Sequence, residues 1–188
     1  MPTHPIRYTL TLALTLSAAH PERVRKLVLV SPLRDGLQIR SMDARTRAAL
    51  GPAGAARISA LSTAQGTLRD PRALRDLFGA LGRMWWARPP SPALLDALTR
   101  SVQYHGTADA SFLAQLVLWD GRTVARTVRA PTLVIAGAAD LSCLPTESRQ
   151  IADSLAHGRF VEIAAAGHLP FVEQPTAFLN VVRTFIAD

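Results

Sequence analysis

Three short apolar runs, separated by long stretches of helical patterning, constrain the fold of this chain more than any other feature. Residues 26–30 read Lys-Leu-Val-Leu-Val, residues 131–136 read Pro-Thr-Leu-Val-Ile-Ala, and residues 159–163 read Arg-Phe-Val-Glu-Ile. Short runs rich in β-branched residues predict strands that are buried in a sheet. Strands of this kind that alternate with helices form a mostly parallel sheet flanked by helices. The sequence therefore predicts an α/β fold.

Helical signals surround these runs. Residues 8–20 are expected to form a helix that His20-Pro21 ends, because the residue before a proline avoids the helical region. Thr146 is expected to cap a helix that continues to about residue 156. Pro175 is expected to open the last helix, which has one apolar face. That face carries Phe178, Val181, Val182 and Phe185.

The middle of the chain has no strand pattern and several helical ones. Asp70-Pro71 and Ser91-Pro92 each combine a capping side chain with a proline at the first helical position. A third helix is expected to carry Phe112, Leu116 and Trp119. We interpret residues 41–130 as an all-helical lid inserted into a core made of residues 1–40 and 131–188.

The composition indicates which kinds of molecule the protein is not expected to bind. The formal charge is +7, but the arginines are scattered singly and no basic stripe interleaves with aromatic residues, so we expect no nucleic-acid partner. No apolar stretch reaches the roughly 18 residues of a membrane span, so no membrane partner is expected. Leu10–Leu16 followed by Ser-Ala-Ala resembles a secretory leader, but threonines interrupt the apolar run. We therefore expect a cytoplasmic protein, with a secreted one as the alternative.

Two side chains follow the ends of the second and third predicted strands. Asp140 lies four residues beyond residue 136, and His168 lies just beyond the third strand. Functional groups of an open parallel sheet gather beyond the carboxyl ends of its strands, so these loops are expected to meet at one edge. A carboxylate beside an imidazole orients the ring and stabilises its protonated form. Asp35, after the first strand, is the alternative acid.

The remaining reactive side chains give no second site. Cys143 is the single cysteine, which excludes an internal disulfide, and we interpret it as buried filler or a chance surface thiol rather than a nucleophile. Four histidines have no metal-ligand spacing, and neither a metal ion nor a cofactor is expected. These histidines are His4, His20, His105 and His157.

Three segments in order resemble the α/β-hydrolase family. Residues 20–30 resemble the junction between the nucleophile helix and the next strand, residues 130–140 resemble the strand and turn that deliver the acid, and residues 167–175 resemble the histidine loop. The order of acid and then histidine is the order of that family. The resemblance implies a partial α/β-hydrolase fold, with Asp140 as the acid and His168 as the base of a triad.

The family's nucleophile motif, Gly-x-Ser-x-Gly, does not occur around any of the eleven glycines. The family spacing places the nucleophile about fourteen residues before Pro21, at Arg7. Ser17 lies inside a predicted helix and Ser31 follows a different strand, so neither can simply take the place of the missing nucleophile. A misplaced start or frame disruption, a split protein and a decayed paralogue each explain the pattern, and we favour the first. Either a complementing N-terminal half or a second copy is expected at the exposed sheet edge.

The resemblance implies hydrolysis of a small ester, lactone or related acyl compound by a serine, histidine and aspartate mechanism. Trp85, Trp86 and Trp119 are expected to line an apolar substrate pocket beneath the lid. The alternative is a catalytically inactive truncated homologue, or a binding or interaction module that retains the lid pocket.

Overall fold

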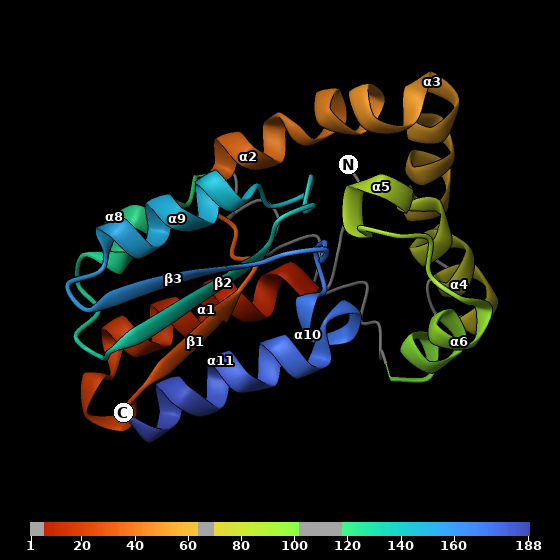
Figure 1. Cartoon of the computed structure of the whole chain (residues 1–188). Coiled ribbons are helices and arrows are strands. Elements are labelled where there is room, and N and C mark those ends of the chain that lie inside the picture. The colour runs from red at the N-terminus through yellow and green to blue at the C-terminus, as the bar shows by residue number, and fades with distance from the viewer. Residues whose placement is uncertain (1–5, 64–69, 102–117) are drawn as a thin grey trace.

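The computed structural model describes residues 6–63, 70–101 and 118–188, and its elements follow the predicted alternation of strands and helices (Figure 1). The strands are β1 (Leu27–Val30), β2 (Thr132–Gly137) and β3 (Gly158–Ile163). The helices that flank them are α1 (Ile6–Ala19), η1 (Pro21–Arg23), α8 (Gly121–Ala125), α9 (Pro145–Ser154), α10 (Pro170–Glu173) and α11 (Pro175–Ala187). The helices between β1 and α8 are α2 (Gly36–Arg40), α3 (Met42–Thr63), α4 (Pro71–Ala80), α5 (Gly82–Trp85) and α6 (Pro92–Ser101).

The three strands form one parallel sheet in the order β1-β2-β3. Leu27 pairs with Thr132, which in turn pairs with Gly158, so the three strands start level with one another. All six residues of β2 are buried, as expected for the central strand of a sheet covered on both faces. The prediction of a mostly parallel α/β fold is confirmed.

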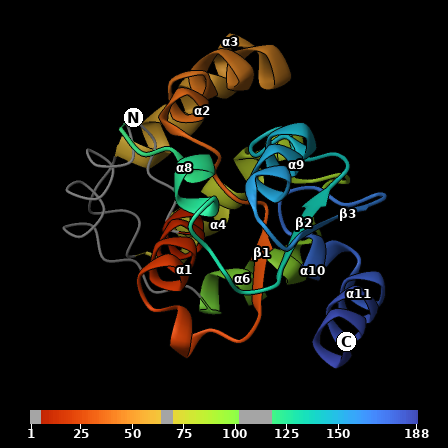
Figure 2. The ribbon, with the colours of Figure 1, turned by 90° about the vertical axis from the view of Figure 1, so that its left-hand side faces the viewer.

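Alternate residues of β2 face two different layers of helices. Val134 packs with Leu14 of α1 and Ile151 of α9 on one face. Leu133 and Ile135 pack on the other face with the apolar side of α11. Figure 2, turned by a quarter, places α1, α8 and α9 on one side of the sheet and α11 on the other. This two-layer covering is what the two-residue period of a strand requires.

The helices α3 to α6 lie beyond the carboxyl ends of the strands, on the right and upper side of Figure 1. Their buried side chains form a third apolar group, which we call the lid cluster after the lid that the sequence predicts. It consists of Met42, Ile58, Leu74, Leu77, Phe78, Leu81, Met84, Trp85 and Trp86, joined by Leu169 from the histidine loop. Ala125, Val128 and Ala130 pack against the sheet, and the division of the chain into a core and an inserted lid stays a prediction.

Several local predictions have clear outcomes. Asp70 accepts a hydrogen bond from the amide of Arg72 and caps α4, as predicted. Helix α3 is broken at Gly51, whose φ of 72° favours glycine, and Pro52 begins the second half. The prediction that Thr146 caps α9 is wrong, because the helix already begins at Pro145. Phe112 and Leu116 of the third predicted lid helix lie outside the described residues.

Candidate active site

The loop after β2 fixes Asp140 by its own hydrogen bonds. Its Oδ1 accepts hydrogen bonds from the amides of Ser142 at 2.8 Å and Cys143 at 2.9 Å, which folds the chain back over the carboxylate. The loop also passes close to the histidine loop. A Cβ atom at Gly137 would stand 2.1 Å from the carbonyl oxygen of Gly167. Glycine is therefore required where the two loops cross.

Backbone contacts hold the histidine loop from two directions. The amide of His168 donates to the carbonyl oxygen of Trp85 at 2.7 Å, and its own carbonyl accepts from the Ser31 hydroxyl at 3.1 Å. Ser31 and Ala165 both have positive φ, at 48° and 53°. Such strain in residues other than glycine persists only where the surroundings fix it, and it gathers at functional sites.

Glu173 ties the same loop to the end of α5. One oxygen of its carboxylate accepts a hydrogen bond from the amide of Gly167 at 2.6 Å, and the other accepts from the amide of Ala87 at 2.8 Å. A carboxylate that accepts from two backbone amides is a strong positional restraint. The His168 backbone is thereby fixed relative to α5 and the lid cluster.

These restraints bring Asp140 and His168 into direct contact. The Nδ1 atom of His168 lies 2.9 Å from Oδ2 of Asp140, and both side chains are buried. Burial lowers the pKa of His168, but the charge of Asp140, its hydrogen bond and the neighbouring Cys143 together raise that pKa to about 9. When the ring is neutral, a proton on Nδ1 donates to the carboxylate and leaves Nε2 as a base. The arrangement can therefore accept a proton at Nε2 and stabilise the imidazolium that forms.

Cys143, interpreted from the sequence as buried filler or a chance surface thiol, lies buried beside this pair. It is fully buried, and ligand atoms of Asp140, Cys143 and His168 lie within 4.8 Å of one another. Oxygen, sulfur and nitrogen are the ligand types that zinc accepts, so these three residues could hold a metal ion. Such an ion would have to replace the contact between Nδ1 and Oδ2. The sequence signal for this contact is that Cys143 follows Asp140 by three residues, within the turn that the Asp140 carboxylate caps.

The structure separates the three tryptophans that the sequence placed together. The ring of Trp85 stacks on His168 at 4.7 Å between centroids, tilted by 38°. Trp86 lies in the lid cluster, and its indole donates to the carbonyl of Phe78 at 2.9 Å. Trp119 packs with the sheet core, against the group that contains Leu14. Only Trp85 contacts the candidate site among these three.

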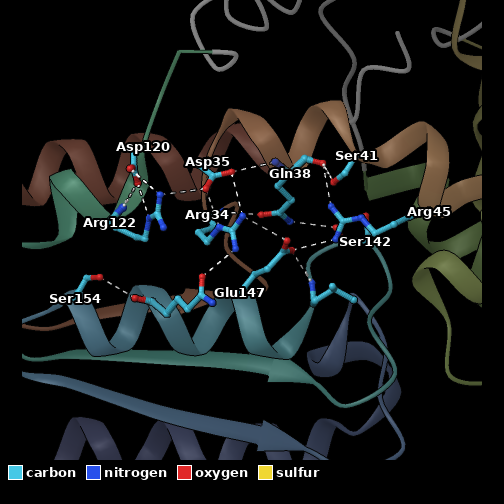
Figure 3. Close-up of polar contacts among 12 residues, drawn as sticks. Arg34, Asp35, Gln38, Ser41, Arg45, Asp120, Arg122, Ser142, Glu147 and Ser154 are labelled. Carbon is cyan, nitrogen blue, oxygen red and sulfur yellow. Dashed lines mark hydrogen bonds and ion pairs between the residues drawn. The ribbon is translucent and has the colours of Figure 1, made fainter.

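A polar network borders the site between α2, α3 and α9 (Figure 3). Glu147 of α9 lies 3.1 Å from the Nη1 atom of Arg45 in α3 and 3.9 Å from Nη2 of Arg34. Gln38 donates to the carbonyl oxygen of Ser142 at 3.1 Å, which connects this network to the Asp140 turn. The network thus joins the first helices of the middle segment to the loop that carries the acid.

Asp35, the alternative acid, belongs to this network (Figure 3). Its Oδ1 accepts from the amide of Gln38 and caps α2, and its Oδ2 lies 2.8 Å from Nε of Arg34. Arg122 approaches the same carboxylate at 3.5 Å. The carboxylate at Nδ1 of His168 is that of Asp140. Asp35 therefore has a structural place of its own.

The other polar residues singled out in the sequence lie away from the imidazole ring. Ser31 contacts the backbone carbonyl of His168 rather than its ring. Ser17 is fully buried inside α1, and its hydroxyl has no hydrogen-bond partner among the residues that the structure describes. His20 lies 3.7 Å from Glu22 on the surface, and His157 is exposed. His4 and His105 fall outside the described residues.

Comparison with known proteins agrees with the fold. The family model described as alpha/beta hydrolase fold matches residues 11–175. The chain is 42% identical over 63 residues to the candidate non-heme bromoperoxidase BpoC of Mycobacterium tuberculosis, a match that covers 34% of this chain and 24% of that protein. It is 28% identical over 180 residues to the biotin biosynthesis bifunctional protein BioHC of Teredinibacter turnerae, covering 93% of this chain and 31% of that protein.

Solved structures show the same fold at lower identity. An alpha/beta fold family hydrolase of Bacillus anthracis superposes with a TM-score of 0.68 at 18% identity, covering 93% of this chain and 63% of that one. A proline iminopeptidase of Mycobacterium smegmatis superposes with a TM-score of 0.63 at 20% identity, covering 94% and 61%. The chain therefore spans less than two thirds of these solved relatives and about a quarter to a third of the two curated ones.

Proposed function

Because the chain belongs to the α/β-hydrolase fold family, we propose that Asp140 and His168 are the acid and the base of a hydrolytic triad. The observation that carries this proposal is the 2.9 Å contact between His168 Nδ1 and Asp140 Oδ2, made by two buried side chains beyond adjacent strands. The substrate class we propose is a small ester, lactone or related acyl compound.

In the proposed reaction, Nε2 of His168 removes the proton from a serine hydroxyl as the oxygen attacks the acyl carbonyl. Asp140 keeps the imidazole oriented and stabilises its positive charge. The protonated ring then gives its proton to the departing alcohol, and a water molecule releases the acid by the same steps in reverse roles. No metal ion or cofactor takes part in this scheme.

We propose that the nucleophilic serine comes from a complementing N-terminal half, because Gly-x-Ser-x-Gly does not occur in these 188 residues. The share of the solved relatives that the chain spans is consistent with this source. Strand β1 pairs only with β2 among the described residues, so its other edge has backbone groups available for another strand. A second copy of the chain is the alternative occupant of that edge.

The test combines gene sequence and hydrolysis. The DNA upstream of the coding region is sequenced and translated in all three frames to look for Gly-x-Ser-x-Gly. The chain is then assayed for hydrolysis of a chromogenic short-chain ester, with and without any segment found there. His168→Ala is expected to lower the rate of the complemented protein by at least about a thousandfold, because triad members act as a unit. His157→Ala, at an exposed histidine, is the matched control and should leave the rate unchanged.

Equal rates for His168→Ala and the unmodified complemented protein would overturn the triad. The chain would then be interpreted as an inactive homologue or as a binding or interaction module. Activity of the chain alone that His168→Ala abolishes would instead overturn the complementing half and point to a nucleophile within these residues.

We also propose a cytoplasmic location. No helix among the described residues is long and apolar enough to cross a membrane. Leu14 of α1 is only 2% exposed and packs with Leu27, Leu29 and Val134, so α1 contributes to the core, which favours its retention in the mature protein. N-terminal sequencing of the mature protein tests this proposal, and cleavage near Ala19 would refute it.

A further inference from the structure

A small cavity lies between α3, α5 and the loop that carries Asp140. Its volume is about 320 Å³, at the lower end of the range for small-molecule sites. It is lined by Arg45, Ala48, Ala49, Arg83, Leu141 and Leu144. The cavity therefore combines an apolar wall with two arginines.

The apolar wall comes from two directions. Ala48 and Ala49 lie on α3, and their small side chains leave the space open. Leu141 and Leu144 come from the loop between β2 and α9 and face the same hollow. A short hydrocarbon chain would exclude water from this wall at a gain of about 0.8 kcal/mol for each buried methylene group.

The two arginines give the cavity a positive charge. Arg45 is 18% exposed, and its guanidinium contacts Glu147 at 3.1 Å and the carbonyl oxygen of Gln38 at 2.9 Å, yet its buried Nε has no hydrogen-bond partner among the described residues. Arg83 is exposed and has no carboxylate partner within the described ranges. Glu147 is shared with Arg34, at 3.9 Å. Arg34 is paired more closely with Asp35, at 2.8 Å, so Glu147 balances Arg45 and the cation left to attract an anionic ligand is Arg83.

Both sides of the cavity are joined to the catalytic pair by short chain segments. Leu141 follows Asp140 directly, and Arg83 precedes Trp85 by two residues. Trp85 stacks on the His168 ring and accepts a hydrogen bond from the His168 amide. The walls of the cavity therefore belong to the same chain segments that carry the acid and that contact the base.

We infer that this cavity binds the carboxylate end of a small aliphatic acyl compound, with Arg83 as the main cationic contact and the alanines and leucines around the hydrocarbon. As a statement about substrate, this inference rests on the proposed function. As a statement about binding, it stands on the cavity alone. Arginine suits this role because its planar guanidinium can donate two parallel hydrogen bonds to a carboxylate.

The test compares two probes of equal length, hexanoate and hexanamide, by ligand-observed NMR titration of the purified chain. Hexanoate is expected to bind at least about tenfold more tightly than hexanamide, because only hexanoate carries the charge. Arg83→Gln should remove this tenfold preference and leave hexanamide binding unchanged. Arg72→Gln, at an exposed arginine of α4 away from the cavity, is the matched control and should retain the preference.

A second variant tests the apolar wall. Ala49→Leu fills the cavity and is expected to weaken both probes, while far-UV circular dichroism checks that the chain stays folded. Equal affinity for the two probes, an unchanged preference in Arg83→Gln, or an equal loss in Arg72→Gln would each overturn the inference. Ester hydrolysis is not used in this test, so a failed triad with retained selectivity for hexanoate would refute the proposed function and leave the carboxylate cavity standing.

Discussion

Replacing Asp140 with asparagine is expected to abolish a pH dependence of stability that the buried pair creates. Burial lowers the pKa of His168, but Asp140 and Cys143 raise it to about 9, from the ordinary value of 6.5. Between these two pH values the folded chain binds more protons than the unfolded chain. The free energy of unfolding therefore has its full contribution from this pair below pH 6.5 and loses it as the pH rises towards 9.

The magnitude follows from the separation of the two pKa values, 9 minus 6.5. That difference of about 2.5 corresponds to about 3 kcal/mol, since each pKa unit is worth roughly 1.4 kcal/mol. In Asp140→Asn the side-chain oxygen can still accept from the amides of Ser142 and Cys143, while the amide nitrogen faces His168 Nδ1. Its N–H group donates to a neutral ring, so the pKa of His168 falls and the slope disappears.

The assay is urea unfolding followed by tryptophan fluorescence at about pH 6, 7, 8 and 9. The unmodified chain should lose about 3 kcal/mol of unfolding free energy across the series, and Asp140→Asn should lose little. Asp188→Asn is the matched control, because Asp188 is an exposed carboxylate paired with Arg159 at 2.6 Å and should leave the slope intact. A flat profile for the unmodified chain, or an unchanged slope in Asp140→Asn, would refute the reasoning.

Three further substitutions test the packing around the site by thermal or urea unfolding. Trp85→Ala is expected to cost about 3–5 kcal/mol, because the ring is fully buried between the lid cluster and the imidazole; a cost under about 1 kcal/mol would contradict that placement. Gly137→Ala should destabilise the chain by at least about 2 kcal/mol, since its Cβ would meet the carbonyl oxygen of Gly167 at 2.1 Å. Gly79→Ala is the control inside α4: its Cβ would lie 3.6 Å from the Leu95 side chain, an ordinary contact, so it should stabilise the chain by about 0.5–1 kcal/mol. Equal effects of the two substitutions would refute the account of the crossing loops. Glu147→Gln should cost about 1–3 kcal/mol, because two arginines lose the charge of a mostly buried carboxylate, and a neutral result would show that solvent already screens the pair.

The strands and the meeting of the acid with the histidine were predictable because they depend on simple rules. The runs at 27–30 and 133–136 are wholly apolar and so have few alternatives to a buried strand, whereas the third, with Arg159 and Glu162, forms the more exposed β3. Once the strands are parallel, loops after neighbouring strands share one edge, and this brings Asp140 and His168 together. Asp70 was equally predictable, since Asp followed by proline is a local signal that needs no tertiary contact.

The structure differs from the prediction, or adds to it, where the detail of a local turn or a contact between distant segments decides the outcome. Thr146 has the side chain of a cap, but Pro145 begins α9 and the Glu147 carboxylate accepts from the amide of Leu144, so the helix starts earlier. Cys143 lies beside His168 because Asp140 caps a turn whose shape a sequence pattern does not report. Trp119 joins the sheet core although a helical pattern grouped it with the lid.

Among the residues that the structure describes, contacts within the chain already hold Asp140 and His168 together, and none of these contacts involves the segment proposed to supply the serine. Asp140 is fixed by two amides of its own loop, and the His168 backbone by Trp85 and Ser31. We therefore expect the acid and the base to be preorganised before any complementing half binds. Complementation would then add a nucleophile and oxyanion donors to an existing pair, so the pH dependence of stability should be the same with and without the added segment. A pH dependence that emerged only upon complementation would show that the added half builds the pair.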